Sequence, residues 1–137
     1  MRSFITALQF LTRIRLVQQP DLTIEDFGRS VRCFTLVGLV LGSIQFLIGS
    51  VLISFLDISY VTAAIFVLLP ILLTGGLHAD GFMDTVDGLF SGRSRERMLE
   101  IMKDSRTGSF GVVAFGCCLL FDFALVLDLG AAPTVLL

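Results

Sequence analysis

Three long apolar runs dominate the chain. Residues 34–56 and 58–77 carry no charge, and residues 110–129 carry only Asp122 and Asp128. A helix needs roughly 20 residues to cross a bilayer, and each run is close to that length. Because a helix satisfies its own backbone hydrogen bonds in lipid, the runs predict three transmembrane helices. A further apolar run begins at 134–137, so we expect this chain to be the N-terminal part of a longer domain and inactive alone.

The remaining segments are polar or amphipathic. Residues 4–16 carry an apolar stripe with helical spacing, including Phe4, Leu8 and Leu11, and end with Arg13 and Arg15. They predict an interfacial helix, with a helix packed against the bundle as the alternative. The one long polar segment is 78–109, in which 94–103 reads as a short helix. The expected fold is therefore all-α, a polytopic transmembrane helical bundle, with 1–137 as a single membrane domain.

The basic residues predict the orientation. Every Lys and Arg lies either before residue 34 or within 93–106, and the turn at 57–60 holds only Asp57. Lys and Arg stay on the cytoplasmic side of a membrane. We therefore expect the N-terminus and segment 78–109 in the cytoplasm, in a multi-pass membrane protein.

Composition agrees with a membrane protein. The chain is 55% hydrophobic and 16% charged, with a mean hydropathy of +0.90, whereas soluble domains are about 25% charged. No basic tract points to nucleic acid. Cys33, Cys117 and Cys118 show no zinc-ligand or disulfide spacing and read as buried small hydrophobic residues. Homo-oligomer formation is left open.

Segment 78–109 carries the candidate chemistry. Asp80, Asp84 and Asp87 stand at i, i+4 and i+7, which places them on one face of a helix. Carboxylates so placed repel one another unless a cation lies among them, and hard oxygen ligands suit Mg²⁺ or Mn²⁺. The alternative is a solvated helix face. Gly81 and Gly88 each follow an aspartate and indicate close approach of a helix or a ligand.

Cations follow the acidic positions. Lys103, Asp104, Ser105 and Arg106 stand together just before the third span. Beside a metal cluster they suit a multi-phosphate substrate, since phosphoryl transfer depends on positioning and charge neutralisation; anionic lipid headgroups are the alternative. His78, the single histidine, is either structural or orients a metal ligand.

Several strings resemble the cobalamin synthase family, the adenosylcobinamide-GDP ribazoletransferases. The similarity is collinear over nearly the whole chain and covers Phe-Leu-Thr-Arg at 10–13, Leu-Val-Gly at 36–38, Gly-Leu-His-Ala-Asp-Gly at 76–81, the acidic positions to 88, and Arg-Met-Leu-Glu-Ile-Met-Lys-Asp-Ser-Arg at 97–106. Two positions depart from the pattern: Thr35 replaces the usual Pro, and Asp122 stands where relatives often have Lys.

The resemblance implies a membrane enzyme that joins adenosylcobinamide-GDP to α-ribazole or its 5′-phosphate, uses Mg²⁺ and releases GMP. It implies Mg²⁺ at Asp80, Asp84 and Asp87, with Asp104 or a clustered aspartate such as Asp87 as the base. The substrate-binding residues would be His78, Arg93, Lys103, Ser105 and Arg106. Two other classes stay open: a CDP-alcohol phosphotransferase, whose Asp-Gly-x-x-Ala-Arg signature this sequence lacks, and a divalent-cation carrier.

Overall fold

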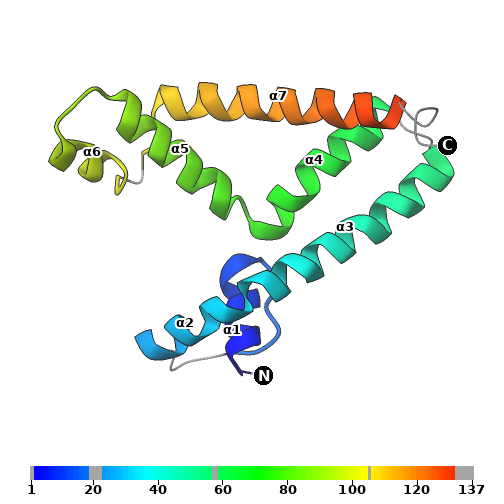
Figure 1. Ribbon diagram of the computed structural model, residues 1–137, viewed down its shortest axis with the longest axis horizontal. Coiled ribbons are helices and arrows are strands. Elements are labelled where there is room, and N and C mark those ends of the chain that lie inside the picture. The colour runs from blue at the N-terminus through cyan, green and yellow to red at the C-terminus, as the bar shows by residue number, and fades with distance from the viewer. Residues whose placement is uncertain (1, 19–22, 57–58, 105, 132–137) are drawn as a thin grey trace. The chain divides into compact units, whose positions relative to one another are not determined.

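Helices are the only regular secondary structure in the described part of the chain. The computed structural model describes residues 2–18, 23–56, 59–104 and 106–131, and these form helices and short connections with no strand among them (Figure 1). The all-α prediction is thus confirmed for this part of the chain. The helices belong to two compact units, Met1–Gly75 and Gly76–Leu137. The prediction of a single membrane domain stays a prediction, and the turn at 57–58 and the run at 134–137 lie outside the described residues.

In the first unit, the N-terminal helix packs against the start of a long apolar helix. Its elements are α1 (Arg2–Leu11), α2 (Ile24–Ser30), the 3-10 turn η1 (Val31–Cys33), α3 (Phe34–Leu56) and α4 (Tyr60–Thr74). Ala7, Leu8 and Leu11 of α1 are buried against Val37 of α3. The apolar stripe of α1 therefore packs on the start of α3. Of the two predicted placements of this helix, the structure favours packing against the other helices.

The prediction that this first helix continues to residue 16 was wrong, since α1 ends at Leu11. The Thr12 hydroxyl donates to the carbonyl of Leu8 at 2.6 Å and accepts from the backbone N–H of Ile14 at 3.1 Å. This hydroxyl competes with the helical backbone bonds and turns the chain. The N–H of Arg13 then donates to the carbonyl of Leu73 at 2.8 Å and ties the end of α1 to the last turn of α4.

Helix α2 was not anticipated from the sequence, although its N-terminus has a readable signal. Thr23 and Asp26 form a capping box: the Thr23 hydroxyl accepts from the N–H of Asp26 at 3.2 Å, and the Asp26 carboxylate accepts from the N–H of Thr23 at 3.3 Å. Both bonds satisfy amides that a helix start leaves without partners.

Two helical stretches are long and apolar enough to cross a membrane among the described residues. They are Ile24–Leu56, which contains α3, and Ser109–Gly130, within the last helix. Helix α3 has the bounds predicted for the first span. The predicted span 58–77 stays a prediction; within it, α4 stops at Thr74. With 15 residues α4 is about 22 Å long. It passes the same test only together with the next helix, as a broken span or a re-entrant loop.

Consecutive glycines end α4. Gly75 and Gly76 have φ angles of 66° and 77°, in the left-handed region that residues with a side chain rarely adopt. The N–H of Gly75 caps the carbonyls of Ile71 and Leu72. The glycine pair was visible in the sequence inside an apolar run, and a glycine at this position is a common stop signal for a helix.

The second unit consists of α5 (Leu77–Phe90), α6 (Arg95–Ile101) and α7 (Ser109–Ala131). Helix α5 packs against the first part of α7, where the rings of Phe82 and Phe115 are 6.5 Å apart between centroids. Helix α6 covers the end of α5, since a Cβ at Gly88 would meet the side chain of Met102 at 2.7 Å. Gly88 thus serves helix packing, whereas a Cβ at Gly81 would meet no other group within 4 Å. Helix α7 covers the third predicted span, 110–129.

Candidate functional site

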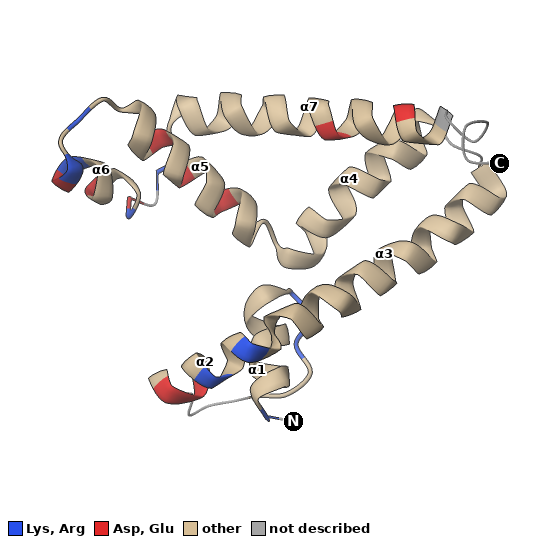
Figure 2. Cartoon of the chain, in the orientation of Figure 1, with Lys and Arg blue, Asp and Glu red and all other residues tan. Residues whose placement is uncertain are grey.

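Helix α5 carries the acidic residues of the predicted site. Figure 2 shows acidic positions along α5 and basic ones in the segment that follows it. The predicted helical placement of Asp80, Asp84 and Asp87 is confirmed. Their surroundings differ: Asp80 is exposed, Asp84 is half-buried, and Asp87 keeps only 8% of its surface accessible.

Asp80 and Asp84 form an open acidic pair, one turn apart on the helix. Among the described residues neither side chain has a hydrogen-bond or ion-pair partner, and the charges of Asp80 and Asp87 repel that of Asp84. A divalent cation would relieve this repulsion. Two carboxylates that leave several coordination positions for water and phosphate oxygens fit Mg²⁺, which is commonly held by one or two carboxylates.

The Asp87 carboxylate is directed to the start of α7. One oxygen accepts from the backbone N–H of Gly108 at 2.6 Å, and the other accepts from that of Gly111 at 2.8 Å. The first amides of a helix have no partner within the helix, and a carboxylate there is also favoured by the helix dipole. Asp87 therefore caps α7 from the neighbouring helix.

The structure separates the predicted metal ligands into a pair and a single residue. In the part of the chain that is described, no three His, Cys, Asp or Glu side chains are grouped closely enough to hold a metal ion. Asp87 is engaged by α7, whereas Asp80 and Asp84 remain open. The magnesium site stays a prediction, and the open pair fits it best.

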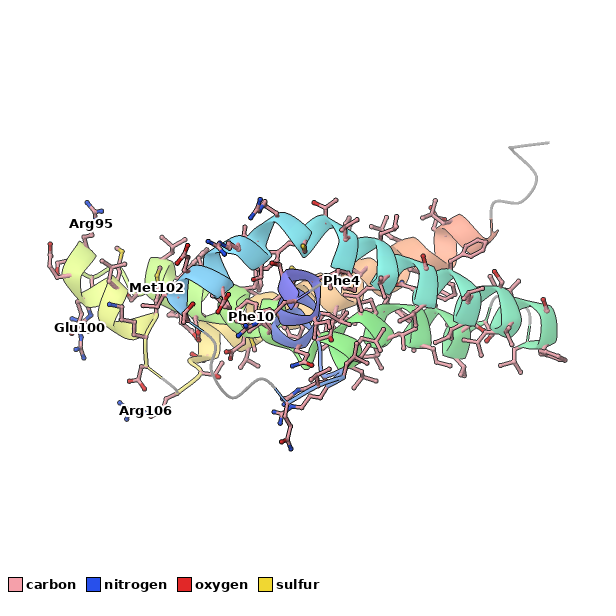
Figure 3. The ribbon with its side chains drawn as sticks, turned by 90° about the horizontal axis from the view of Figure 1, so that it is seen from below. Phe4, Phe10, Arg95, Glu100, Met102 and Arg106 are labelled. Carbon is pink, nitrogen blue, oxygen red and sulfur yellow. The ribbon has the colours of Figure 1, made fainter. Side chains whose placement is uncertain are left out.

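The predicted phosphate-binding cations are exposed. Arg93 lies in the connection between α5 and α6, and Lys103 follows α6. Figure 3 shows Arg95, Glu100 and Arg106 pointing outward from this end of the second unit. The cations can therefore reach an anionic ligand without moving the helices.

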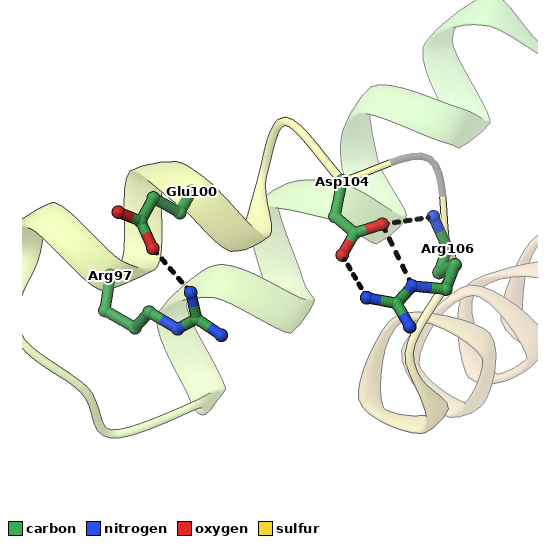
Figure 4. Close-up of polar contacts among 4 residues, drawn as sticks. All are labelled: Arg97, Glu100, Asp104 and Arg106. Atoms are coloured by element: carbon green, nitrogen blue, oxygen red, sulfur yellow. Dashed lines mark hydrogen bonds and ion pairs between the residues drawn. The ribbon is translucent and has the colours of Figure 1, made fainter.

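Arg106 already holds an anion in the structure, the carboxylate of Asp104 (Figure 4). Its Nε and terminal nitrogen donate to the two carboxylate oxygens at 3.2 and 2.9 Å, and its backbone N–H donates at 3.0 Å. These bonds from Arg106 hold the pKa of Asp104 below its ordinary value of 3.8. Asp104 is consequently ionised at neutral pH, and it occupies the guanidinium fork that a phosphate would use.

Two predicted substrate-binding residues, His78 and Ser105, remain. His78 is exposed in the first turn of α5, and its side chain makes no hydrogen bond within the described residues. Ser105 lies outside the described residues. Substrate binding by both residues stays a prediction.

Gly108 and Gly111 were missed from the sequence. A Cβ on Gly108 would overlap the Asp87 carboxylate, and one on Gly111 would lie 2.7 Å from an Asp87 oxygen and 2.7 Å from the Met83 carbonyl. Glycines at i and i+3 at the entry to a span are the signal that could have revealed this close approach.

The fold and the site together define an all-helical membrane protein in which an acidic helix and a cationic segment share one compact unit. Residues 3–137 match the cobalamin-5-phosphate synthase family, and the chain belongs to that family. The resemblance seen in the sequence is thereby confirmed.

Individual relatives match nearly the whole of this chain. The chain is 46% identical over 136 residues to an adenosylcobinamide-GDP ribazoletransferase of Desulfitobacterium hafniense. The matched region is 99% of this chain and 53% of that protein. It is 39% identical over 135 residues to the protein of that name from Clostridium acetobutylicum, covering 98% and 53%. The chain therefore spans about half the length of these relatives. No solved structure matches the chain.

Proposed function

We propose that the full-length protein joins adenosylcobinamide-GDP to α-ribazole, or to its 5′-phosphate, and releases GMP in a Mg²⁺-dependent reaction. The names of the relatives support this substrate pair. The observation that carries the proposal is the open pair of Asp80 and Asp84, which shares its unit with the exposed cations Arg93, Lys103 and Arg106. Such a set matches the charge of a diphosphate and its metal ion.

Each group has a role in binding the diphosphate. Asp80 and Asp84 would hold Mg²⁺, which when bound neutralises charge on the phosphate oxygens. Arg93 and Lys103 would bind phosphate oxygens directly. Arg106 would do the same after exchanging Asp104 for a phosphate, because one guanidinium fork accepts one bidentate anion at a time.

The chemical step is a displacement at phosphorus. A hydroxyl oxygen of α-ribazole bonds to the phosphorus nearer the cobinamide, the bond from that phosphorus to the bridging oxygen breaks, and GMP leaves with that oxygen. The hydroxyl proton passes to a base. Asp104 and Asp87 were the predicted bases, and both carboxylates are engaged, Asp104 by Arg106 and Asp87 by two amides. The choice of base stays a prediction.

The proposal includes the location of the site. The distribution of Lys and Arg supports a cytoplasmic N-terminus and a cytoplasmic segment around 93–106 in the bacterial inner membrane. Nucleotide-linked substrates would then reach the site from the cytoplasm.

The direct test uses membranes that contain the full-length protein. Adenosylcobinamide-GDP, α-ribazole and Mg²⁺ are added, and GMP and the joined corrinoid are quantified by chromatography. Equal amounts of both products are expected, with no product when a chelator removes Mg²⁺. CMP release from a CDP-alcohol, or Mg²⁺ uptake into vesicles without GMP release, would instead favour the phosphotransferase or the carrier.

A further inference from the structure

The proposed site has two parts that come from different stretches of the chain. The metal-binding carboxylates lie on α5, and the cation Arg106 lies in the connection that leads into α7. A diphosphate can be held by both parts only if their separation is fixed. Small displacements of positioned groups reduce rates strongly, so some contact must set this spacing.

Asp87 is the residue that joins the two parts. It is on α5, one turn beyond Asp84, and its two oxygens accept from the amides of Gly108 and Gly111. Gly108 is only two positions after Arg106. The backbone that carries Arg106 is thus tied to the helix that carries the open acidic pair.

The contact is closely fitted. Asp87 keeps 8% of its surface accessible, and the space around its carboxylate exists because residues 108 and 111 lack side chains. Both oxygens already accept a short charge-assisted bond, each of which is stronger than a neutral hydrogen bond. Asp80 and Asp84, by contrast, have no such partner among the described residues.

We propose that Asp87 is a positioning residue: it holds the start of α7, and with it Arg106, at a fixed place on α5, while Asp80 and Asp84 bind the metal ion. This assignment rests on the proposed function for the role of Arg106. The spacing of the three aspartates alone had predicted that all of them bind the metal ion. Gly108 and Gly111 contribute to this positioning, because the Asp87 carboxylate fits only where these two residues have no side chain.

The test compares Asp87→Asn, Gly108→Ala and Asp84→Asn in the full-length protein in detergent. Gly116→Ala is the matched control, since a Cβ at this position on α7 would meet no other group within 4 Å. Three quantities are measured: deuterium exchange of the peptide that covers 106–112, Mn²⁺ affinity by electron paramagnetic resonance, and KM for adenosylcobinamide-GDP.

Asp87→Asn and Gly108→Ala should both speed exchange in this peptide by about tenfold or more, because the buried charge-assisted bonds are weakened. Both should raise KM about tenfold and keep the Mn²⁺ affinity within about twofold of the wild type. Asp84→Asn should show the reverse, with Mn²⁺ affinity reduced at least about tenfold and unchanged exchange. Gly116→Ala should match the wild type throughout.

Two results would overturn the assignment. One is an Asp87→Asn protein that loses Mn²⁺ affinity as strongly as Asp84→Asn, which would make Asp87 a ligand. The other is wild-type exchange in Gly108→Ala, a variant that keeps every aspartate and so guards against a folding defect of Asp87→Asn. If the wild type releases no GMP, the proposed function fails, yet exchange and Mn²⁺ binding still decide the role of Asp87.

Discussion

Gln45 of α3 donates a side-chain hydrogen bond to the backbone carbonyl of Phe66 in α4, at 3.2 Å. Phe66 is four positions before Pro70, and proline has no N–H to bond that carbonyl within the helix. The neighbouring helix thus supplies the donor that Pro70 removes. The Phe66 ring also fills the space left by Gly49, one turn after Gln45. Helices α3 and α4 are therefore matched at a defined register.

Gln45→Leu should destabilise the α3–α4 pair. It leaves the Phe66 carbonyl without a donor, at a cost of about 1 kcal/mol for a hydrogen bond between membrane helices. Pro70→Ala restores the backbone N–H, so Gln45→Leu should cost almost nothing in that background. Unfolding of the protein in mixed micelles measures all four members of this cycle. An equal cost in both backgrounds would contradict the explanation.

Asp84→Asn should remove the Mg²⁺-dependent reaction. Loss of one carboxylate of the open pair weakens binding of the metal ion that would neutralise the phosphate oxygens. We therefore expect the rate of GMP release to fall at least about 100-fold. Glu96→Gln is the control, because it also removes an exposed negative charge within the same unit. Protein content of the membranes is checked by immunoblot. Turnover near the wild-type rate in Asp84→Asn would refute the metal site.

The Asp104–Arg106 pair leads to a prediction about pH. The pKa of Asp104 lies below 3.8 because Arg106 bonds its carboxylate. The folded state therefore favours the ionised form, and the pair is present above the ordinary pKa and lost only as pH falls through the lowered one. Between about pH 5 and 8 the charge of Asp104 does not change.

Asp104→Asn should therefore keep the acid limb of the wild-type activity profile in that range. KM for the diphosphate substrate should fall, since the Asp104 carboxylate no longer competes with the phosphate for the Arg106 fork. Loss of the acid limb, or a fall in kcat of about 100-fold with unchanged KM, would identify Asp104 as the general base.

The glycine pair after α4 can be separated into two effects. Gly75→Ala and Gly76→Ala each place a side chain in the left-handed region, which costs about 1–2 kcal/mol. Only a Cβ at Gly75 would also overlap the Arg13 side chain. Gly75→Ala should thus lower the melting temperature more than Gly76→Ala, and Arg13→Ala should remove the difference. Equal shifts for both glycines would show that Arg13 does not restrict this turn.

The orientation of the membrane helices can be tested by labelling. In a cysteine-free background, Arg93→Cys should react with an impermeant maleimide only after the cells are opened, because the Lys and Arg distribution predicts that this segment is cytoplasmic. A cytoplasmic marker protein controls for leakage. Labelling of intact cells from the outside would reverse the predicted topology.

Local patterns predicted the features that depend on local chemistry. The uncharged run 34–56 gave the bounds of α3, and the spacing of the aspartates gave the helix α5. The same spacing could not distinguish Asp87 from Asp80, because burial of one aspartate depends on where α7 crosses α5. The glycine pair at 75–76 is a helix stop signal that the sequence contains. It was overlooked because the apolar run around it favours one continuous span.

The bond from the Arg13 amide to the Leu73 carbonyl has a consequence for biosynthesis. Helix α1 leaves the ribosome before α3 and α4, yet its partner Leu73 lies in the last turn of α4. Closing so long a loop of chain is entropically costly unless the intervening helices already bring its ends together. The end of α1 therefore reaches its place beside α4 only after α3 and α4 have both been made.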